Sequence, residues 1–299
     1  MNRVIITAVI KTARLPFLFL TLVCVALAFS LAEINQAGID TVSALVIMIT
    51  ALSAHITINI LNEYMDFKSG LDFETVKTPF SGGSGALPEY PEAAIWVLST
   101  AIFTVLITLF TGLWLVMQTG VELLIAGLAG LILIVSYTPW INRHPLICLI
   151  APGMGFGPIM LGGSFYVLAG EVTTSLIFSS LVVFFLVNNL LVLNQFPDID
   201  ADRKVGRKNI IISHGINKSI FIYSLFSLAA GMAIVMAVYQ QVFPHLSSWS
   251  LGPWLLTVIP VYGMIKHRNQ IGEHKIYLAT NVLITLLVPL VLALSFILS

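Results

Sequence analysis

Two short acidic segments contain the residues best suited to chemistry in this chain. They read Asn-Glu-Tyr-Met-Asp-Phe-Lys-Ser-Gly-Leu-Asp (62–72) and Asn-Gln-Phe-Pro-Asp-Ile-Asp-Ala-Asp (194–202). The spacing Asn-x-x-x-Asp occurs in both, as Asn62 with Asp66 and as Asn194 with Asp198, and Asp202 extends the second by four more residues. On a helix, residues four apart lie on one face. We therefore expect two helices to present these side chains to each other across a gap.

Each acidic segment follows a long apolar run, which makes its charge expensive. Clustered carboxylates beside hydrocarbon are costly unless a cation neutralises them. Oxygen ligands of this kind suit Mg²⁺, which typically binds through one or two carboxylates together with a substrate's phosphates. A single Asp at the end of an apolar run is usually a solvated loop residue, but two matched segments favour a shared site. The pattern predicts a divalent-metal site that holds a phosphorylated substrate at a membrane surface.

Two residues change the local geometry of these segments. Pro197 removes one backbone hydrogen bond and is expected to kink the second helix just before Asp198. Asp72 lies off the helical stripe, so it joins the site only if the first helix ends near Gly70, a residue type that favours helix ends. Whether Asp72 or Asp200 contacts the metal stays open.

A diphosphate needs positive charge beyond the metal, and basic residues lie close to both segments. Lysine binds phosphate as a point charge and arginine as a bidentate fork. We take Lys77 and Arg203 as the first candidates for phosphate contact, and Lys68 and Lys204 as further ones. The alternative is that these residues only set membrane orientation or attract anionic lipid. The basic residues concerned are Lys68, Lys77, Arg203, Lys204, Arg207 and Lys208.

The composition identifies an integral membrane protein. The 299 residues are 58% hydrophobic and 9% charged, with a mean hydropathy of +0.98, whereas soluble domains carry about 25% charged residues. The apolar runs are near-continuous and of helix-spanning length, which excludes the alternating strands of a barrel. We expect an all-α fold with nine transmembrane helices around a central cavity. The expected spans are 15–32, 41–61, 93–117, 121–139, 146–168, 174–196, 218–240, 250–265 and 276–298.

The basic residues agree with nine spans. If the N-terminus is cytoplasmic, all fourteen Lys and Arg fall before the first span or in loops on the cytoplasmic side, in line with the positive-inside rule. We therefore expect the N-terminus and the acidic segments in the cytoplasm and the C-terminus outside. No linker divides the chain, so residues 1–299 are expected to form a single membrane domain. No nucleic-acid-binding motif occurs.

The paired segments resemble the signatures of the UbiA superfamily of intramembrane aromatic prenyltransferases. The resemblance includes the Tyr137-Thr-Pro segment and covers nearly the whole chain. Many members have an Asp four residues after the first Asp, whereas this chain has Gly70 there and an acid at Asp72 instead. This pattern is most like the menaquinone branch, whose members use dihydroxynaphthoate. The two signatures are Asn62-x-x-x-Asp66-x-x-x-Gly70-x-Asp72 and Asn194-x-x-x-Asp198-x-x-x-Asp202.

This resemblance implies roles for individual residues. Asp66, Asp198 and Asp202 match positions that bind a polyprenyl diphosphate through Mg²⁺, with Asn62 and Asn194 nearby. Lys77 and Arg203 fall near positions that contact phosphate, and Tyr137 matches a segment lining the cavity. The implied reaction forms an allylic carbocation, which an electron-rich aromatic ring attacks.

Alternative functions remain open on the sequence alone. Within the family, the acceptor could instead be 4-hydroxybenzoate or another aromatic precursor. A cation-coupled transporter also uses Asp-lined repeats, although its sites normally lie near the bilayer midplane. A membrane phosphotransferase of the CDP-alcohol type would need one contiguous Asp-rich motif, which this chain lacks. The prenyl chain length and the oligomeric state are not determined by the sequence.

Overall fold

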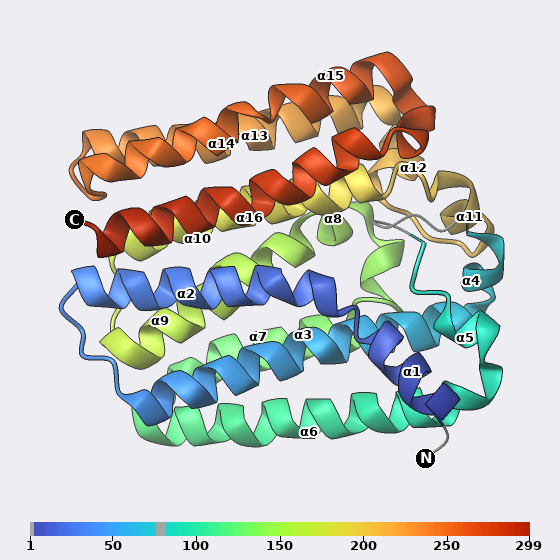
Figure 1. Ribbon diagram of the computed structural model, residues 1–299, viewed down its shortest axis with the longest axis horizontal. Coiled ribbons are helices and arrows are strands. Elements are labelled where there is room, and N and C mark those ends of the chain that lie inside the picture. Colours follow the sequence, from blue (N-terminus) through green and yellow to red (C-terminus); the bar gives the residue numbers. More distant parts are fainter. Residues whose placement is uncertain (1–2, 76–81) are drawn as a thin grey trace.

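The chain folds as a bundle of long helices that lie side by side along one axis (Figure 1). The computed structural model describes residues 3–75 and 82–299, and within these ranges there is helix but no strand. The short helices α1, α4, α5 and α11 gather at one end of the bundle, and the C-terminus lies at the other. The α-helices are α1 (Arg3–Thr12), α2 (Phe19–Ile34), α3 (Thr41–Ser69), α4 (Leu71–Glu74), α5 (Ala86–Glu89), α6 (Ala94–Thr119), α7 (Leu123–Ser136), α8 (Pro145–Met154), α9 (Gly162–Ala169), α10 (Thr174–Asn194), α11 (Ile199–Lys204), α12 (Ile210–His214), α13 (Ile216–Tyr239), α14 (Leu251–Leu255), α15 (Val258–His267) and α16 (Lys275–Ile297).

Seven helical segments of the described chain are long and apolar enough to cross a membrane. This confirms an all-α membrane protein. The two remaining predicted spans are less regular. Residues 121–139 contain α7, which has only 14 residues, and residues 250–265 are divided between α14 and α15. The count of nine transmembrane helices therefore stays a prediction. The seven segments are Arg3–Ile34, Thr41–Ser69, Pro91–Thr119, Pro145–Ala169, Thr174–Asn194, Ile216–Tyr239 and Lys275–Ile297.

Helix α3 carries most of the first acidic segment, and both of its ends are capped. Asp40 accepts a hydrogen bond from the backbone N–H of Ser43 at 2.8 Å and so caps the N-terminus. At the other end Gly70 adopts a left-handed conformation with φ of 82°. The helix continues eight residues past the predicted boundary at residue 61. Asn62 and Asp66 are thus in its last two turns.

The second acidic segment is not one continuous helix, which corrects the expectation of a kinked span. Helix α10 ends at Asn194, and α11 starts after Asp198. Pro197 explains the break, because it has no N–H to donate and disfavours helical geometry at the residue before it. Asn194, Asp198 and Asp202 therefore lie on a helix end, a turn and a short second helix. They do not form a stripe on one face.

Hydroxyl side chains join α3 to α6 along their shared face. Three interhelical hydrogen bonds of 2.8 Å follow one another at helical spacing, and their partners also bond to backbone carbonyls of their own helices. Such pairs satisfy polar groups without exposing them to lipid. The pairs are Thr50 with Thr111, Ser53 with Thr108, and Thr57 with Thr104.

Small residues let α8 and the following π-helical segment η4 (Gly155–Leu161) pack closely on α10. A Cβ added at Gly157 would lie 2.6 Å from the backbone oxygen of Ser180, and one at Gly153 would overlap the backbone oxygen of Phe184. Gly153 also donates its backbone N–H to the side chain of Asn188 at 2.7 Å. Both glycines therefore allow close packing of these helices.

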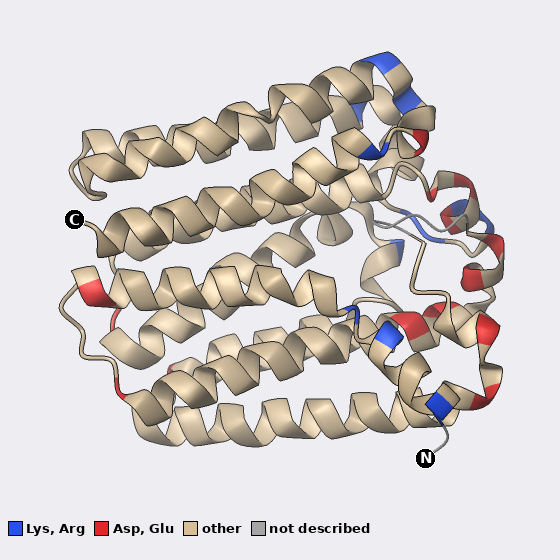
Figure 2. Cartoon of the chain, in the orientation of Figure 1, with Lys and Arg blue, Asp and Glu red and all other residues tan. Residues whose placement is uncertain are grey.

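Charged residues are distributed very unevenly between the two ends of the bundle. Figure 2 shows every Lys and Arg of the described chain at the end where α1, α4 and α11 lie. Most of the acidic residues gather at this same end, and a few lie at the other. The asymmetry inferred from the loops is thus present in three dimensions.

Candidate active site

A cavity of about 590 Å³ opens inside the bundle. Its apolar body is lined by side chains of α2, α3, α6, α7, η4, α10 and α16, among them Leu20, Leu109, Leu128, Phe156, Leu190 and Leu286. Its charged end receives side chains from both acidic segments: Asn62, Asp66, Asp72, Asn194, Asp198 and Asp202. The cavity therefore combines an apolar interior of hydrocarbon character with one strongly polar end.

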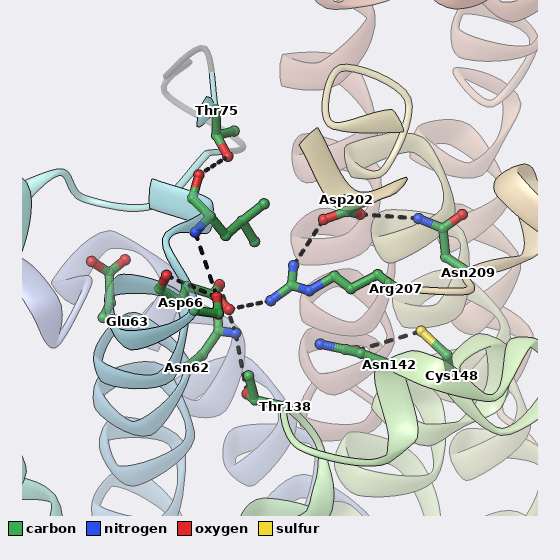
Figure 3. Close-up of polar contacts among 12 residues, drawn as sticks. Asn62, Glu63, Asp66, Thr75, Thr138, Asn142, Cys148, Asp202, Arg207 and Asn209 are labelled. Atoms are coloured by element: carbon green, nitrogen blue, oxygen red, sulfur yellow. Dashed lines mark hydrogen bonds and ion pairs between the residues drawn. The ribbon is translucent and has the colours of Figure 1, made fainter. Parts of the chain in front are cut away.

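Arg207 joins the two acidic segments across this polar end (Figure 3). One guanidinium nitrogen donates to Asp66 Oδ1, and another donates to Asp202 Oδ1 at 3.0 Å. Both carboxylates are buried, with relative exposures of 6% and 4%. The expected meeting of the two segments is thus realised, through a basic residue that lies five positions after Asp202.

Neutral amides hold the remaining oxygens of these two carboxylates. Asn62 donates to Asp66 Oδ2 at 3.1 Å, and Asn209 donates to Asp202 Oδ2 at 3.0 Å. Asn209 is itself fixed, since its side-chain oxygen caps α12 by accepting from the N–H of Ile212. Each carboxylate therefore has one oxygen on an amide and the other on Arg207.

Local backbone geometry turns Arg207 inward. Helix α11 ends at Lys204, and Gly206 adopts a left-handed conformation with φ of 79°. The N–H of Arg207 then bonds back to the carbonyl of Asp202 at 3.0 Å, and the N–H of Lys208 donates to the carbonyl of Asn142 at 2.9 Å. Glycine adopts this left-handed conformation without steric cost, so Gly206 favours the reversal.

Asp198 and Asn194 present free oxygens at the same end. Asp198 Oδ1 and Asn194 Oδ1 are buried and have no hydrogen-bond partner among the described residues. Burial and the nearby charge of Asp202 raise the pKa of Asp198 to about 7. Burial also raises the pKa of Asp202, although Arg207 opposes this shift. Ionised carboxylates are therefore costly at this buried end of the cavity, and a bound cation would stabilise their charged form.

The donor set fits a magnesium ion bound together with a phosphorylated ligand. Oxygen atoms suit Mg²⁺, and two of them are buried without partners. However, no group of three His, Cys, Asp or Glu side chains in the described chain is close enough to hold a metal by itself. Ligation by Asp66, Asp198 and Asp202 together stays a prediction. An ion here would need further oxygens, such as those of a diphosphate.

A further buried carboxylate, Glu63, organises the edge of the cavity. Glu63 is fully buried and accepts from Nε of Arg14 at 2.6 Å, from the N–H of Ser84 at 2.7 Å and from its hydroxyl at 2.6 Å. Arg14 lines the cavity and has a left-handed backbone with φ of 50°. Glu63 thus ties the start of the first span to the Gly82–Gly85 turn above the acidic end.

The other predicted site residues are found in different places. Tyr137 and Asp72 line the cavity, and the end of α3 at Ser69 is what allows Asp72 to do so. Lys68 and Arg203 are exposed and do not line the cavity. Lys204 is also exposed and forms an ion pair with Glu74 on the surface of the protein, away from the cavity. Lys77 lies outside the described residues.

Sequence reasoning does not single out Arg207, Arg14 or Asn209. Arg207 is only one of several cations near the second signature, and nothing in the local pattern distinguishes it from its neighbours. The Gly206-Arg207 pair just after that signature is the available signal, since a glycine there permits a chain reversal. Arg14 is 49 positions from its partner Glu63, and no local pattern reports such a pairing.

With this geometry in place, comparison with known proteins defines the class. The model of the UbiA prenyltransferase family matches residues 17–282, nearly the whole chain. The chain belongs to this family. The expected class, an intramembrane prenyltransferase, is thereby confirmed.

Individual relatives are more distant. The 1,4-dihydroxy-2-naphthoate octaprenyltransferase of Bacillus subtilis is 26% identical over 230 residues, which cover 74% of this chain and 68% of that protein. The solved structure of a digeranylgeranylglyceryl phosphate synthase superposes with a TM-score of 0.70 at 14% identity, over 99% of both chains. A UbiA homologue from Archaeoglobus fulgidus, bound to DMAPP and Mg²⁺, gives 0.63 at 14% identity, over 92% of this chain and 98% of the other. These structural likenesses establish the fold.

Proposed function

We propose that this protein transfers a polyprenyl group from a polyprenyl diphosphate to an aromatic quinone precursor, with Mg²⁺ as cofactor. The acceptor we propose is 1,4-dihydroxy-2-naphthoate. One observation carries the proposal: two buried carboxylates from separate acidic segments meet through Arg207 at the polar end of a 590 Å³ apolar cavity. A diphosphate fits the polar end, and an isoprenoid chain fits the apolar body.

The acidic residues and the basic residues have complementary tasks in the reaction. Asp66, Asp198 and Asp202, assisted by Asn62 and Asn194, would hold Mg²⁺, which when bound offsets the charge of the diphosphate leaving group. Arg207 and Arg14 line the same end and can bind phosphate oxygens through their guanidinium groups. Of the predicted phosphate contacts, Lys77 stays a candidate, whereas the exposed positions of Lys68, Arg203 and Lys204 leave the role to Arg207.

The reaction balances without any further reactant. The allylic C–O bond breaks, and its electron pair leaves with the diphosphate. A carbon of the electron-rich aromatic ring attacks the resulting carbocation, and that ring then loses a proton or carbon dioxide. The apolar cavity walls keep out water, which would otherwise capture the cation. Phe156 and Tyr137 are aromatic residues of these walls.

Two features support the choice of acceptor. The Bacillus subtilis relative is named for 1,4-dihydroxy-2-naphthoate, and the Gly70-x-Asp72 pattern is similar to that branch. The structure adds that Asp72 is buried and lines the cavity. We further propose that the protein lies in the inner (cytoplasmic) membrane with its acidic end facing the cytoplasm, because all the Lys and Arg of the described chain gather there.

Product analysis tests the proposal. The purified full chain is incubated with geranylgeranyl or farnesyl diphosphate and one of several acceptors, in Mg²⁺ or in EDTA. We expect diphosphate release and a prenylated naphthoate product in Mg²⁺ and neither in EDTA. A prenylated 4-hydroxybenzoate instead would keep the reaction but change the acceptor. Uptake of substrate into vesicles without a change of its mass would identify a transporter and overturn the proposal.

A further inference from the structure

We propose that Arg207 is a built-in competitor of the divalent cation, which makes bound metal and bound diphosphate strengthen each other's binding. The guanidinium neutralises Asp66 and Asp202 until a diphosphate offers it a better partner. This inference rests on the proposed function, because it assumes that metal and diphosphate use the polar end. It adds a device that selects a metal–diphosphate pair over the bare ion.

The hydrogen bonds show which oxygens are already in use. In both Asp66 and Asp202, Oδ1 accepts from Arg207 and Oδ2 accepts from an asparagine amide. A cation that binds at the Oδ1 atoms of these carboxylates competes directly with the guanidinium. By contrast, Asp198 Oδ1 and Asn194 Oδ1 have no partner among the described residues. They are available to an ion without moving Arg207.

Burial makes this competition strong. The Arg207 side chain is 18% exposed, and the two carboxylate side chains are 9% and 5% exposed. Removing the partners of a buried charge leaves it uncompensated, which is far more costly than at the surface. A bare cation that binds Asp66 and Asp202 would therefore leave the guanidinium without these partners. This cost lowers the net affinity of the site for the bare cation.

A diphosphate removes this penalty. Arginine binds phosphate in a bidentate manner, with charge-assisted hydrogen bonds, and Arg207 lines the same cavity end as the acidic residues. Once the guanidinium bonds to phosphate, the Oδ1 atoms become free for the cation. The two ligands are then coupled, and by linkage each raises the affinity for the other by the same factor.

Binding measurements on the full-length protein in detergent test the coupling. Mg²⁺ and inorganic diphosphate are titrated separately and together by calorimetry, and thermal unfolding is followed in parallel. For the wild type we expect Mg²⁺ to bind at least about fivefold more tightly when diphosphate is present, at the lower end of usual couplings. For Arg207→Gln we expect bare Mg²⁺ to bind more tightly than it does in the wild type and diphosphate to bind more weakly, with the coupling lost.

The sign of the first effect separates this role from a structural one. A residue that merely holds the site together would weaken Mg²⁺ binding when it is removed, whereas a competitor strengthens it. Arg203→Gln is the matched control, because Arg203 is an exposed arginine of the same segment that does not line the cavity. It should leave both affinities and their coupling at wild-type values. Equal or weaker binding of bare Mg²⁺ by folded Arg207→Gln would overturn the proposal.

A milder variant covers the case in which Arg207→Gln does not fold. Arg207→Lys keeps the positive charge but cannot form two bonds in a fork, so we expect reduced coupling; unchanged coupling in this variant would overturn the inference. A failure of the proposed function is distinguishable, because the wild type would then give no prenylated product. Prenyl transfer combined with intact coupling in Arg207→Gln would overturn the competitor role alone.

Discussion

Asp198 and Asp200 are neighbours in sequence with opposite surroundings. Asp198 lines the cavity, and its Oδ1 is buried without a hydrogen-bond partner among the described residues, whereas Asp200 is exposed and does not line it. Asp198 lies just before α11 and Asp200 lies within it, and of the two only Asp198 reaches the polar end of the cavity. This pair therefore supplies an internal control for the chemistry.

We predict that Asp198→Asn lowers kcat/KM for prenyl transfer by at least roughly 100-fold, because electrostatic stabilisation of the leaving group is lost. Asp200→Asn should remain within about twofold of the wild type, since a surface charge contributes little. Steady-state kinetics with thermal unfolding as a folding check measures both. Similar losses in the two variants would show that general charge at this end, and not the position of Asp198, supports activity.

The raised pKa of Asp198 predicts a pH dependence of metal binding. A carboxylate must be deprotonated to bind a metal ion, and Asp198 has its pKa near 7. Affinity for Mg²⁺ is therefore full above pH 7 and falls as the pH drops below it, by roughly tenfold between pH 8 and pH 6 for one proton. Calorimetry at the two pH values measures this change, and Asp198→Asn should make it much smaller. A wild-type affinity that is flat over this range would contradict the assignment.

Among the elements, the contact of α8 and η4 with α10 leaves little room for a larger side chain. We predict that Gly157→Ala lowers the free energy of unfolding by about 1–3 kcal/mol, because the added methyl group overpacks the interface. Gly155→Ala is the matched control, since an added Cβ there meets no atom of the described residues within 4 Å. Thermal unfolding in detergent compares the two. Equal stability of both variants would show that the interface between η4 and α10 adjusts to the added methyl group without cost.

The edge of the cavity depends on Glu63, which joins Arg14 to the turn at Ser84. Glu63→Gln keeps the shape but removes the charge, so we expect a loss of about 2 kcal/mol, the size of hydrogen bonds to a charged group. Faster hydrogen exchange at residues 82–86 should accompany it. Glu92→Gln, at an exposed carboxylate away from the cavity, is the control. Unchanged hydrogen exchange at this turn in Glu63→Gln would show that Glu63 does not hold it in place.

These elements also show what the sequence can and cannot predict. Apolar runs long enough to cross a bilayer predict the fold class and most span positions, because a backbone buried in lipid must form helices or closed barrels. The spacing of Asn62 and Asp66 predicts their shared face correctly. Pro197 is expected to kink a helix that in fact ends at Asn194, and Arg207 lies inward through a glycine-dependent reversal. Such features depend on tertiary contacts that periodicity does not report.

For the molecule as a whole, the charge asymmetry between the ends predicts its orientation. Both native cysteines are buried, so single exposed cysteines can report on each end. We expect Ser213→Cys, at the charged end, to react with a membrane-impermeant maleimide only in inverted vesicles. Ser299→Cys, at the opposite end, should react only from outside intact cells or spheroplasts. Both positions are exposed serines. Labelling of both from the same side would contradict an odd number of spans between Ser213 and Ser299.

The most direct test is to locate a divalent ion and a diphosphate in the protein. Crystals of the full chain with Mn²⁺ and a non-hydrolysable prenyl diphosphate analogue would show both, and anomalous scattering would identify the ion. We predict metal density within about 2.0–2.6 Å of an Asp198 oxygen, with the diphosphate at the polar end and the prenyl chain in the apolar body. Density for the analogue elsewhere, with no ion between the two acidic segments, would contradict prenyl transfer at this site.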